Sequence, residues 1–452
     1  MFRKNVLKKR GSKAMAVMLA LSMLAGLAAC GKEEKKESSS GRFVIAEREV
    51  ESSSEKESSS RSAESSAEST AESSSASPEG TTGAPEDTTT PAADDTTTPD
   101  PADTGTPAPT DTTPTDTPTP EVSETPTPEP TKSGDSGQTA PSDYKAPDLS
   151  GATKDEIKLI KGIYVLRDTG YEAYTYLENV AVSYADTVNA AAKKFPGVRV
   201  VNTVIPLSSG ITFPEHLRGN ISSSNQKTSL EKIQAKISSD VKFVNIFDTM
   251  NAHRDEYIYY RTDHHWTGRG AYYAYAEIMK ALGKTTKNLS DYTVKRYDGF
   301  YGSFWNDTKS AQLETNPDYV ECYDSGASTS LTFTQTDGQT LAWPLFNDVT
   351  KYGKTLKYCA YAAGDNPYTV IKNKGLSDGS ACIVVKESFG NAFVPYLVDH
   401  YQTIYEVDYR YYKKSFAELV KTTGATEIYI INNIGMTRSK LLVGKLAACL
   451  AS

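Results

Sequence analysis

The residues best suited to chemistry lie in two short segments that are far apart in the sequence. The first segment, residues 260–267, carries Asp263 and His265 two positions apart. On an extended backbone these side chains point to the same side, and that of His264 points to the other. Asp263 could then accept a hydrogen bond from Nδ1 of His265 and leave Nε2 free to act as a base. We expect His264 to make a structural hydrogen bond and Trp266 to pack beneath the site.

The second segment carries Ser388. The apolar run 381–385 is typical of a buried strand, and Gly390 opens a predicted helix. The Ser388 hydroxyl is therefore expected at the carboxyl end of a strand and beside a helix N-terminus. Ligands of open α/β sheets bind there, and backbone N–H groups there can stabilise an oxyanion. Ser388 could instead simply cap the helix.

The elements that must position these residues alternate along the chain. Strands are predicted at 163–166, 198–205, 241–246, 381–385, 403–407 and 427–431. Helices are predicted at 171–195, 230–237, 268–282, 391–400, 415–421 and 436–447. This alternation predicts an α/β fold with a mainly parallel sheet covered on both faces. The segment 290–380 is less regular, and we expect it to form insertions or hairpins around one edge of the sheet.

Two motifs of this chain resemble those of a known family. Residues 263–266 (Asp-His-His-Trp) and 387–393 (Glu-Ser-Phe-Gly-Asn-Ala-Phe) are similar to the two blocks of the DHHW family of bacterial envelope proteins. That family is similar to the SGNH-hydrolase-like domains of alginate O-acetyltransferases, and the resemblance covers most of Tyr164 to Asn433. It implies a three-layer SGNH-like fold with a permuted motif order, in which the Asp-x-His block precedes the Ser block.

The resemblance also implies roles for the site residues. Ser388 would be the nucleophile, His265 the general base and acid, and Asp263 the residue that orients His265. Ser388 would attack an acetyl ester to give an acyl-enzyme, and a sugar hydroxyl or water would then take the acyl group. The implied function is O-acetyl transfer to, or removal from, a cell-envelope polysaccharide.

Further residues are candidates for substrate contacts or for the second oxyanion donor, beside the backbone N–H of Ser388. They are Asn391, Ser208, Ser209, Gly302 and Ser303. The asparagine lies about one turn into the predicted helix. The consecutive serines follow a predicted strand, and the glycine-serine pair ends the segment 300–303. Both of these segments could equally be plain turns.

Metal-dependent functions fit these residues less well. Manganese-dependent DHH phosphoesterases need further Asp and His clusters upstream of Asp263, and the sequence from 144 onward has none. A zinc site is disfavoured because adjacent histidines on a strand diverge and no His-x-x-x-His accompanies them. We therefore expect no metal and no cofactor. The main alternative is a non-catalytic lipoprotein on the same fold that binds carbohydrate or cell wall, since fold does not dictate activity.

Residues 1–30 resemble a bacterial lipoprotein signal peptide. Basic residues precede the apolar stretch 14–27, which is shorter than the roughly 20 residues that span a bilayer. The segment ends in the lipobox-like string Leu27-Ala28-Ala29-Cys30-Gly31. Cleavage before Cys30 and acylation of its thiol would anchor the protein to the membrane. The expected location is the extracellular face of the cell membrane.

Residues 31–143 are expected to be a disordered linker that holds the folded domain, 144–452, away from the membrane. Their Ser/Glu blocks and Thr/Pro/Asp repeats carry too little apolar surface to offset the entropy of ordering. The net charge of −8 argues against a nucleic-acid partner. Expected partners are an envelope polysaccharide, the membrane and, for a transferase, a membrane-bound acyl donor protein.

Four cysteines remain after Cys30, and their spacing matches no zinc pattern. They are compatible with buried thiols or with a single disulfide, for which three pairings are possible. These residues are Cys322, Cys359, Cys382 and Cys449.

Overall fold

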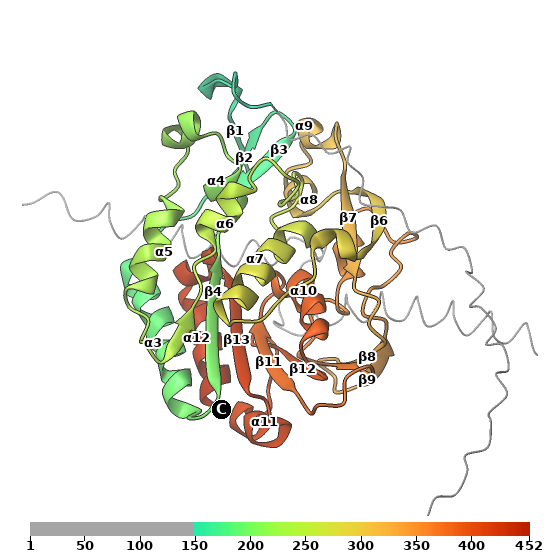
Figure 1. Cartoon of the computed structure of the whole chain (residues 1–452). Coiled ribbons are helices and arrows are strands. Elements are labelled where there is room, and N and C mark those ends of the chain that lie inside the picture. The colour runs from blue at the N-terminus through green and yellow to red at the C-terminus, as the bar shows by residue number, and fades with distance from the viewer. Residues whose placement is uncertain (1–147) are drawn as a thin grey trace, which may run out of the picture. The chain divides into compact units, whose positions relative to one another are not determined.

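The computed structural model describes residues 148–452 (Figure 1). The predicted signal peptide, Cys30 and the linker 31–143 lie outside the described residues, so the corresponding expectations stay predictions.

The main sheet has eight strands in the order β5-β4-β13-β11-β12-β10-β8-β9. The five strands from β5 to β12 in that order are parallel, as the sequence predicted. The last three pair antiparallel, and they come from the irregular segment 290–380. The bounds are β4 Arg199–Ile205, β5 Val241–Phe243, β8 Thr329–Thr334, β9 Thr340–Trp343, β10 Tyr368–Asn373, β11 Ala381–Lys386, β12 Thr403–Asp408 and β13 Glu427–Asn433.

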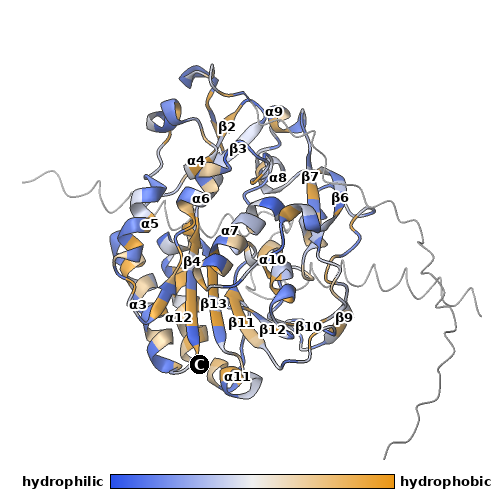
Figure 2. Cartoon of the chain, viewed as in Figure 1, coloured by the Kyte–Doolittle hydropathy of each residue, from blue (hydrophilic) through white to orange (hydrophobic). Residues whose placement is uncertain are grey.

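Helices cover both faces of this sheet, which makes the fold a mixed α/β architecture. Figure 1 shows α7 in front of the strands and α12 behind them, where α12 packs against α3. Apolar residues concentrate on β4, β13 and β11 between these helices (Figure 2). The long helices are α3 Glu178–Lys194, α5 Gln226–Gln234, α7 Gly268–Ala281, α11 Phe416–Thr423 and α12 Lys440–Ala451.

Several predicted helix boundaries were wrong. The helix predicted from 171 begins only at Glu178, because Thr169–Glu172 form a strand. The helix predicted at 391–400 is a short α-helix followed by a 3-10 helix, Val394–Asp399, because Pro395 cannot donate a backbone hydrogen bond. Helix α5 begins before residue 230, at Gln226, because its N-cap, Asn225, accepts a hydrogen bond from the Thr228 amide.

A second group of elements lies above the carboxyl ends of the parallel strands in Figure 1. The strand predicted at 163–166 belongs here, in a separate antiparallel sheet with its two neighbours, and not in the main sheet. The group comprises β1 Lys158–Ile160, β2 Ile163–Leu166, β3 Thr169–Glu172, α4 Ser208–Ile211, α6 Phe247–Ala252, α8 Ser303–Thr308 and α9 Ala311–Glu314. Beside it lies a two-stranded antiparallel sheet of β6 Thr293–Phe300 and β7 Asp318–Asp324.

The four remaining cysteines are all free thiols in the structure, so the buried-thiol alternative applies to it. Three are buried and Cys359 is half-buried. Burial raises the pKa of Cys359 to about 11 and that of Cys449 to about 12, which keeps both protonated at neutral pH.

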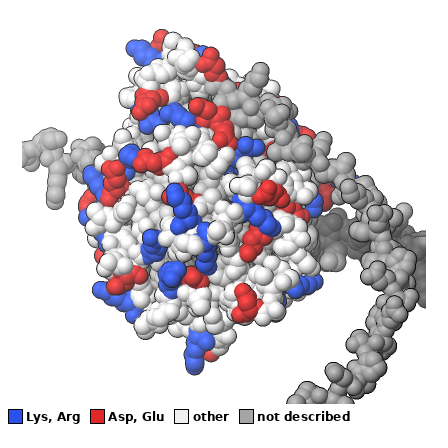
Figure 3. All heavy atoms as spheres, in the orientation of Figure 1, with Lys and Arg blue, Asp and Glu red and all other residues white. Residues whose placement is uncertain are grey.

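The outer surface of the domain carries charged side chains of both signs. On the face drawn in Figure 3, acidic and basic side chains are interspersed. No helix among residues 148–452 is both long and apolar enough to cross a membrane.

Candidate active site

Ser388 lies in a sharp turn at the carboxyl end of β11. The strand ends at Lys386, and helix α10 (Gly390–Phe393) begins two residues after the serine. A Cβ atom on Gly390 would lie 2.5 Å from the Cβ atom of Lys386, so this turn needs a glycine. The half-buried Ser388 is thereby held at the strand end that the sequence predicted.

The Asp-His-His-Trp run lies in a loop that directly precedes α7 and whose two ends pair with each other. Tyr259 and Trp266 form an isolated antiparallel bridge across it. Asp318, at the start of β7, fixes the loop from outside. Its buried carboxylate accepts hydrogen bonds from the amides of Arg261 and Thr262, at 3.0 and 2.7 Å. The sequence analysis missed Asp318, because 56 residues separate it from Thr262.

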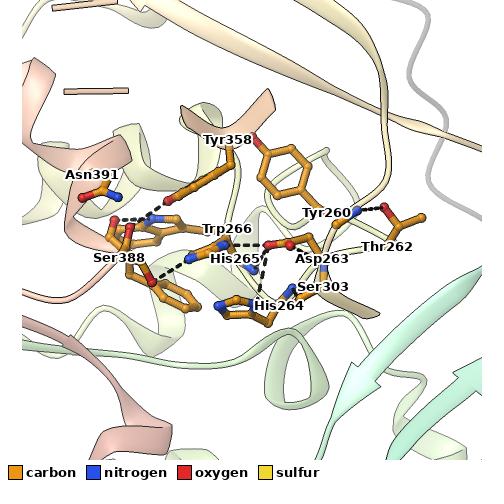
Figure 4. Close-up of polar contacts among 12 residues, drawn as sticks. Tyr260, Thr262, Asp263, His264, His265, Trp266, Ser303, Tyr358, Ser388 and Asn391 are labelled. Atoms are coloured by element: carbon orange, nitrogen blue, oxygen red, sulfur yellow. Dashed lines mark hydrogen bonds and ion pairs between the residues drawn. The ribbon is translucent and has the colours of Figure 1, made fainter. Parts of the chain in front are cut away.

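Three side chains from these two segments form one hydrogen-bonded row (Figure 4). The Nε2 atom of His265 lies 2.7 Å from Oγ of Ser388. On the other side of the ring, Nδ1 lies 2.6 Å from Oδ1 of Asp263. The structure thus brings together the Asp, His and Ser that the sequence singled out. The row matches the geometry of a nucleophile, a base and an orienting carboxylate.

The Asp263 carboxylate is held on both oxygens. Oδ1 also accepts the backbone N–H of His265 at 2.9 Å, and Oδ2 accepts the N–H of Ser303 at 2.7 Å. A Cβ atom on Gly302 would lie 2.2 Å from Oδ2, so a glycine is required beside the carboxylate. Gly302 and Ser303 were predicted as candidate substrate contacts. In the structure they contact the Asp263 carboxylate and hold it in place.

The charge state of Asp263 follows from these contacts. Burial acts to raise its pKa, but the neighbouring His264 and His265 charges and the hydrogen bonds outweigh burial. The net effect holds the pKa of Asp263 well below its usual range, so the carboxylate is ionised at neutral pH. An ionised Asp263 is suited to stabilise a protonated His265.

Aromatic residues position the base. The ring of Tyr358 stacks on that of His265, with centroids 4.0 Å apart and planes 11° apart. The Tyr358 hydroxyl donates to the carbonyl of Ser388 at 3.0 Å. Trp266 is fully buried beneath the site, as predicted, and its Nε1 donates to the carbonyl of Phe389 at 2.9 Å. Tyr358 was not predicted, because it comes from the irregular segment and only the fold brings it here.

His264 differs in part from its prediction. It makes a hydrogen bond, between Nδ1 and Oγ of Ser303 at 2.7 Å. However, its ring does not face away, since its centroid lies 3.8 Å from that of His265. Ligand atoms of Asp263, His264 and His265 consequently lie within 4.8 Å of one another, so the expectation that adjacent histidines diverge was wrong. Hydrogen bonds join His265 to Asp263, whereas Nδ1 of His264 lies 3.7 Å from Oδ1 of Asp263.

Glu387, beside Ser388, is a buried carboxylate that the sequence analysis did not assign a role. Oε1 accepts the N–H of Asn433 at 2.9 Å, and Oε2 accepts the N–H of Phe389 at 3.2 Å. Burial raises the pKa of Glu387 despite these bonds and the charge of Arg410. Glu387 thus ties the Ser388 turn to the end of β13.

The other residues predicted as substrate contacts are buried and bond to neighbouring side chains. Asn391 is buried, and its amide bonds to Lys386 and, through Nδ2 at 2.9 Å, to Asp365. Figure 4 shows this amide apart from the Ser388–His265 bond. Ser208 and Ser209 are buried in α4, where the Ser209 hydroxyl accepts a hydrogen bond from Gln226. A role of these three residues in substrate binding stays a prediction.

Known structures share this fold. A crystal structure of a DHHW family protein from Eubacterium siraeum is 24% identical, covers 64% of this chain and 96% of that chain, and superposes with a TM-score of 0.58. PatB1 from Bacillus cereus is 20% identical over 63% of this chain and 98% of that chain, with a TM-score of 0.52. A second structure of PatB1, with a sulfonyl adduct, is 19% identical over 60% and 93%, with a TM-score of 0.50.

The family assignment follows from the sequence. No curated protein matches this chain significantly. The family described as DHHW protein matches residues 143–407, which is more than half of the chain and includes both the Asp-His-His-Trp run and Ser388. The chain belongs to the DHHW family.

Proposed function

We propose that this protein is a serine acyltransferase or esterase in which Ser388, His265 and Asp263 act as the catalytic triad. One observation carries the proposal, namely the continuous row of hydrogen bonds from Oγ of Ser388 through His265 to Asp263, at 2.7 and 2.6 Å. A hydroxyl in contact with a base that is itself held by an ionised carboxylate is the arrangement that activates a serine.

The mechanism has two halves. In the first, Nε2 of His265 takes the proton of Ser388 while Oγ attacks the ester carbonyl, and the alcohol leaves with that proton. In the second, His265 deprotonates an incoming alcohol or water, which attacks the acyl-enzyme and releases Ser388. Asp263 stabilises the imidazolium in both halves. The backbone N–H of Ser388 is our proposed first donor to the oxyanion.

The proposed substrate is the O-acetyl group of a cell-envelope polysaccharide, on the outer face of the membrane. The lipobox-like string at Cys30 supports export and lipid anchoring, and the linker 31–143 supports reach away from the membrane. A transferase would need a membrane-bound protein as acyl donor, because acetyl-CoA is not available outside the cell. We also infer the three-layer SGNH-like arrangement with permuted motif order, which the position of Asp263 before Ser388 supports.

The alternative is a non-catalytic lipoprotein that binds carbohydrate or cell wall. The chain has 28 tyrosines, and those that are exposed could stack on sugars, but most of them are buried in the core. Sugar binding alone, however, does not require a serine within hydrogen-bond distance of a histidine held by a carboxylate. We therefore favour the enzyme.

The test is hydrolysis of p-nitrophenyl acetate by the full chain and by its variants. Ser388→Ala and His265→Ala are expected to reduce p-nitrophenol release to background, and Asp263→Asn to lower it by about 10⁴-fold. Ser183→Ala, which removes an exposed hydroxyl on α3, is the matched control and should keep full activity. Equal release by wild type and Ser388→Ala would refute the proposed nucleophile.

A second measurement identifies the nucleophile directly. A structure of PatB1 carries a sulfonyl adduct, and sulfonyl fluorides modify activated serines. Treatment with phenylmethylsulfonyl fluoride is expected to add one sulfonyl group to Ser388, seen by peptide mass spectrometry. The His265→Ala variant should remain unlabelled, because its serine lacks a base.

A further inference from the structure

The proposed triad uses only one of the two adjacent histidines. His264 nevertheless lies in the same site, with its ring centroid 3.8 Å from that of His265 and 6.0 Å from that of Phe389, the residue after Ser388. About a third of its side chain is exposed, whereas 8% of the His265 side chain is. In Figure 4 its ring extends from Asp263 toward the Ser388 side of the site. His264 is therefore accessible to a bound substrate.

The Ser303 hydroxyl is the hydrogen-bond partner of Nδ1 of His264. The Ser303 hydroxyl oxygen accepts the backbone N–H of His264 at 3.4 Å and lies 2.7 Å from its Nδ1. Because this oxygen already accepts an N–H, we assign its hydroxyl hydrogen to Nδ1, an assignment that leaves the ring proton on Nε2. Burial, followed by the charge of His265, lowers the pKa of His264 and keeps the ring neutral near pH 7. The outer nitrogen thus presents an N–H donor to the site.

The position of this donor decides what it can bind. During attack on an acyl-serine, the base lies beside the oxygen of the incoming or leaving alcohol. The oxyanion develops on another side of the tetrahedral carbon, toward the backbone donors. Because the ring of His264 lies against that of His265, the outer N–H of His264 is on the side of the tetrahedral carbon that carries the alcohol oxygen. It can therefore reach an oxygen next to the one that His265 deprotonates.

We propose that His264, with its tautomer set by Ser303, binds the acceptor alcohol and selects acceptors with two neighbouring oxygens, as in the vicinal hydroxyls of a sugar. This inference rests on the proposed acyl transfer. In the second half-reaction, one hydroxyl gives its proton to Nε2 of His265 and its oxygen bonds to the acyl carbon. The bond from that carbon to Oγ of Ser388 breaks, and the proton passes from His265 to Oγ. The second oxygen of the acceptor meanwhile accepts the N–H of His264.

The experiment supplies p-nitrophenyl acetate to the full chain with propane-1,2-diol or propan-1-ol as competing acceptors. Ester and acetate products are quantified, and p-nitrophenol release is followed in parallel. We expect the wild type to prefer the diol by about tenfold, the worth of one well-placed hydrogen bond. His264→Phe should lose most of this preference. His264→Gln, which retains an N–H donor, should keep part of it, and Ser303→Ala should lower it.

The outcomes separate the two proposals. If p-nitrophenol release persists but the wild type does not prefer the diol, or if His264→Phe and His264→Gln keep the wild-type preference, the assignment of His264 is overturned. If the wild type releases no p-nitrophenol above the Ser388→Ala background, the proposed function itself fails and His264 has no acceptor to bind. A purely structural His264 would change stability in the variants without changing the ratio of products.

Discussion

The placement of the Asp263 carboxylate depends on a residue that is remote in the sequence. Its own segment provides the bonds to His265, but its second oxygen is held by the amide of Ser303, 40 residues later. The close approach of that amide is possible because Gly302 has no side chain. The geometry of the base is thus determined in part by a glycine that contacts neither the base nor the nucleophile.

Substitution of Gly302 tests this dependence. In Gly302→Ala the new Cβ atom would lie 2.1 Å from the Cβ atom of Asp263, which must shift. Because displacement of a catalytic group by about 1 Å can cost 10²-fold, we expect esterase activity to fall by at least about 100-fold. Gly353→Ala is the matched control, since a Cβ atom there meets nothing within 4 Å. Equal activities of the two variants in the p-nitrophenyl acetate assay would contradict the proposed support.

The depressed pKa of His264 predicts how stability depends on pH. The folded state holds this ring neutral below its usual pKa of 6.5, whereas the unfolded chain protonates it there. The unfolded state therefore binds more protons as the pH falls below 6.5, and the wild type loses stability in that window. We expect the melting temperature of wild type to drop more steeply than that of His264→Gln between about pH 6.5 and 5. Parallel melting curves for the two proteins across this window would contradict the assignment.

Residue types and local spacing were enough to single out the three residues of the row. Asp263 and His265 are two positions apart, and Ser388 follows a recognisable strand. The supports were not predictable in the same way. Tyr358 and Glu387 act through contacts with residues that are remote in sequence, such as the Tyr358 ring on His265 and the Glu387 carboxylate on the Asn433 amide. No local pattern marks such contacts.

At the scale of elements, the carboxyl ends of β11 and β12 carry a buried charged cluster next to the Ser388 turn. Lys386 is fully buried, and its Nζ atom lies 3.0 Å from Glu406 and 4.0 Å from Asp408. Arg410 donates to Asp408 through Nε at 2.8 Å and reaches Asp365 at 2.9 Å. Burial raises the pKa of Glu406 to about 7, although Lys386 opposes this shift.

Removal of the buried lysine should therefore be costly. Lys386→Met leaves the buried Glu406 without its nearest cation, and we expect the free energy of unfolding to fall by about 3–5 kcal/mol. The matched control is Lys372→Met on β10, an exposed lysine whose loss should change stability by less than about 0.5 kcal/mol. Urea denaturation measures both. A loss in Lys386→Met no larger than in the control would mean that the cluster does not need its lysine.

The sequence predicted the type of most elements better than their ends or their partners. The apolar run 381–385 was recognisable because a strand buried on both faces is continuously apolar. The run at 163–166 was equally strand-like, but its pairing with residues 158–160 and 169–172 in a separate sheet depends on neighbours rather than on its composition. Helix ends depended on single residues, such as Pro395 within a helical pattern.

At the scale of the whole molecule, the match to the family ends before the fold does. The DHHW family covers residues 143–407, yet β13, at Glu427–Asn433, lies in the middle of the sheet between β4 and β11. Its end also provides the N–H of Asn433 to Glu387, beside Ser388. The domain that contains the site therefore includes the chain up to α12, and the first strand of the main sheet, β4, needs a partner from near the carboxyl end.

The sequence predicts that a lipid on Cys30 anchors this domain to the membrane. If Cys30 is the lipidated residue, the full chain expressed in a bacterial host will incorporate labelled palmitate and sediment with membranes. The Cys30→Ser variant should lose the label and leave the membrane fraction, because it lacks the thiol that would carry the acyl chains. Cys359→Ser, which alters a half-buried thiol within the domain, is the matched control and should behave as wild type. Membrane retention of an unlabelled Cys30→Ser variant would mean that the first 30 residues stay uncleaved as the anchor or that a partner protein holds the domain. Either result would remove the lipid from the proposal and leave the chemistry of Ser388 to be judged by its own assay.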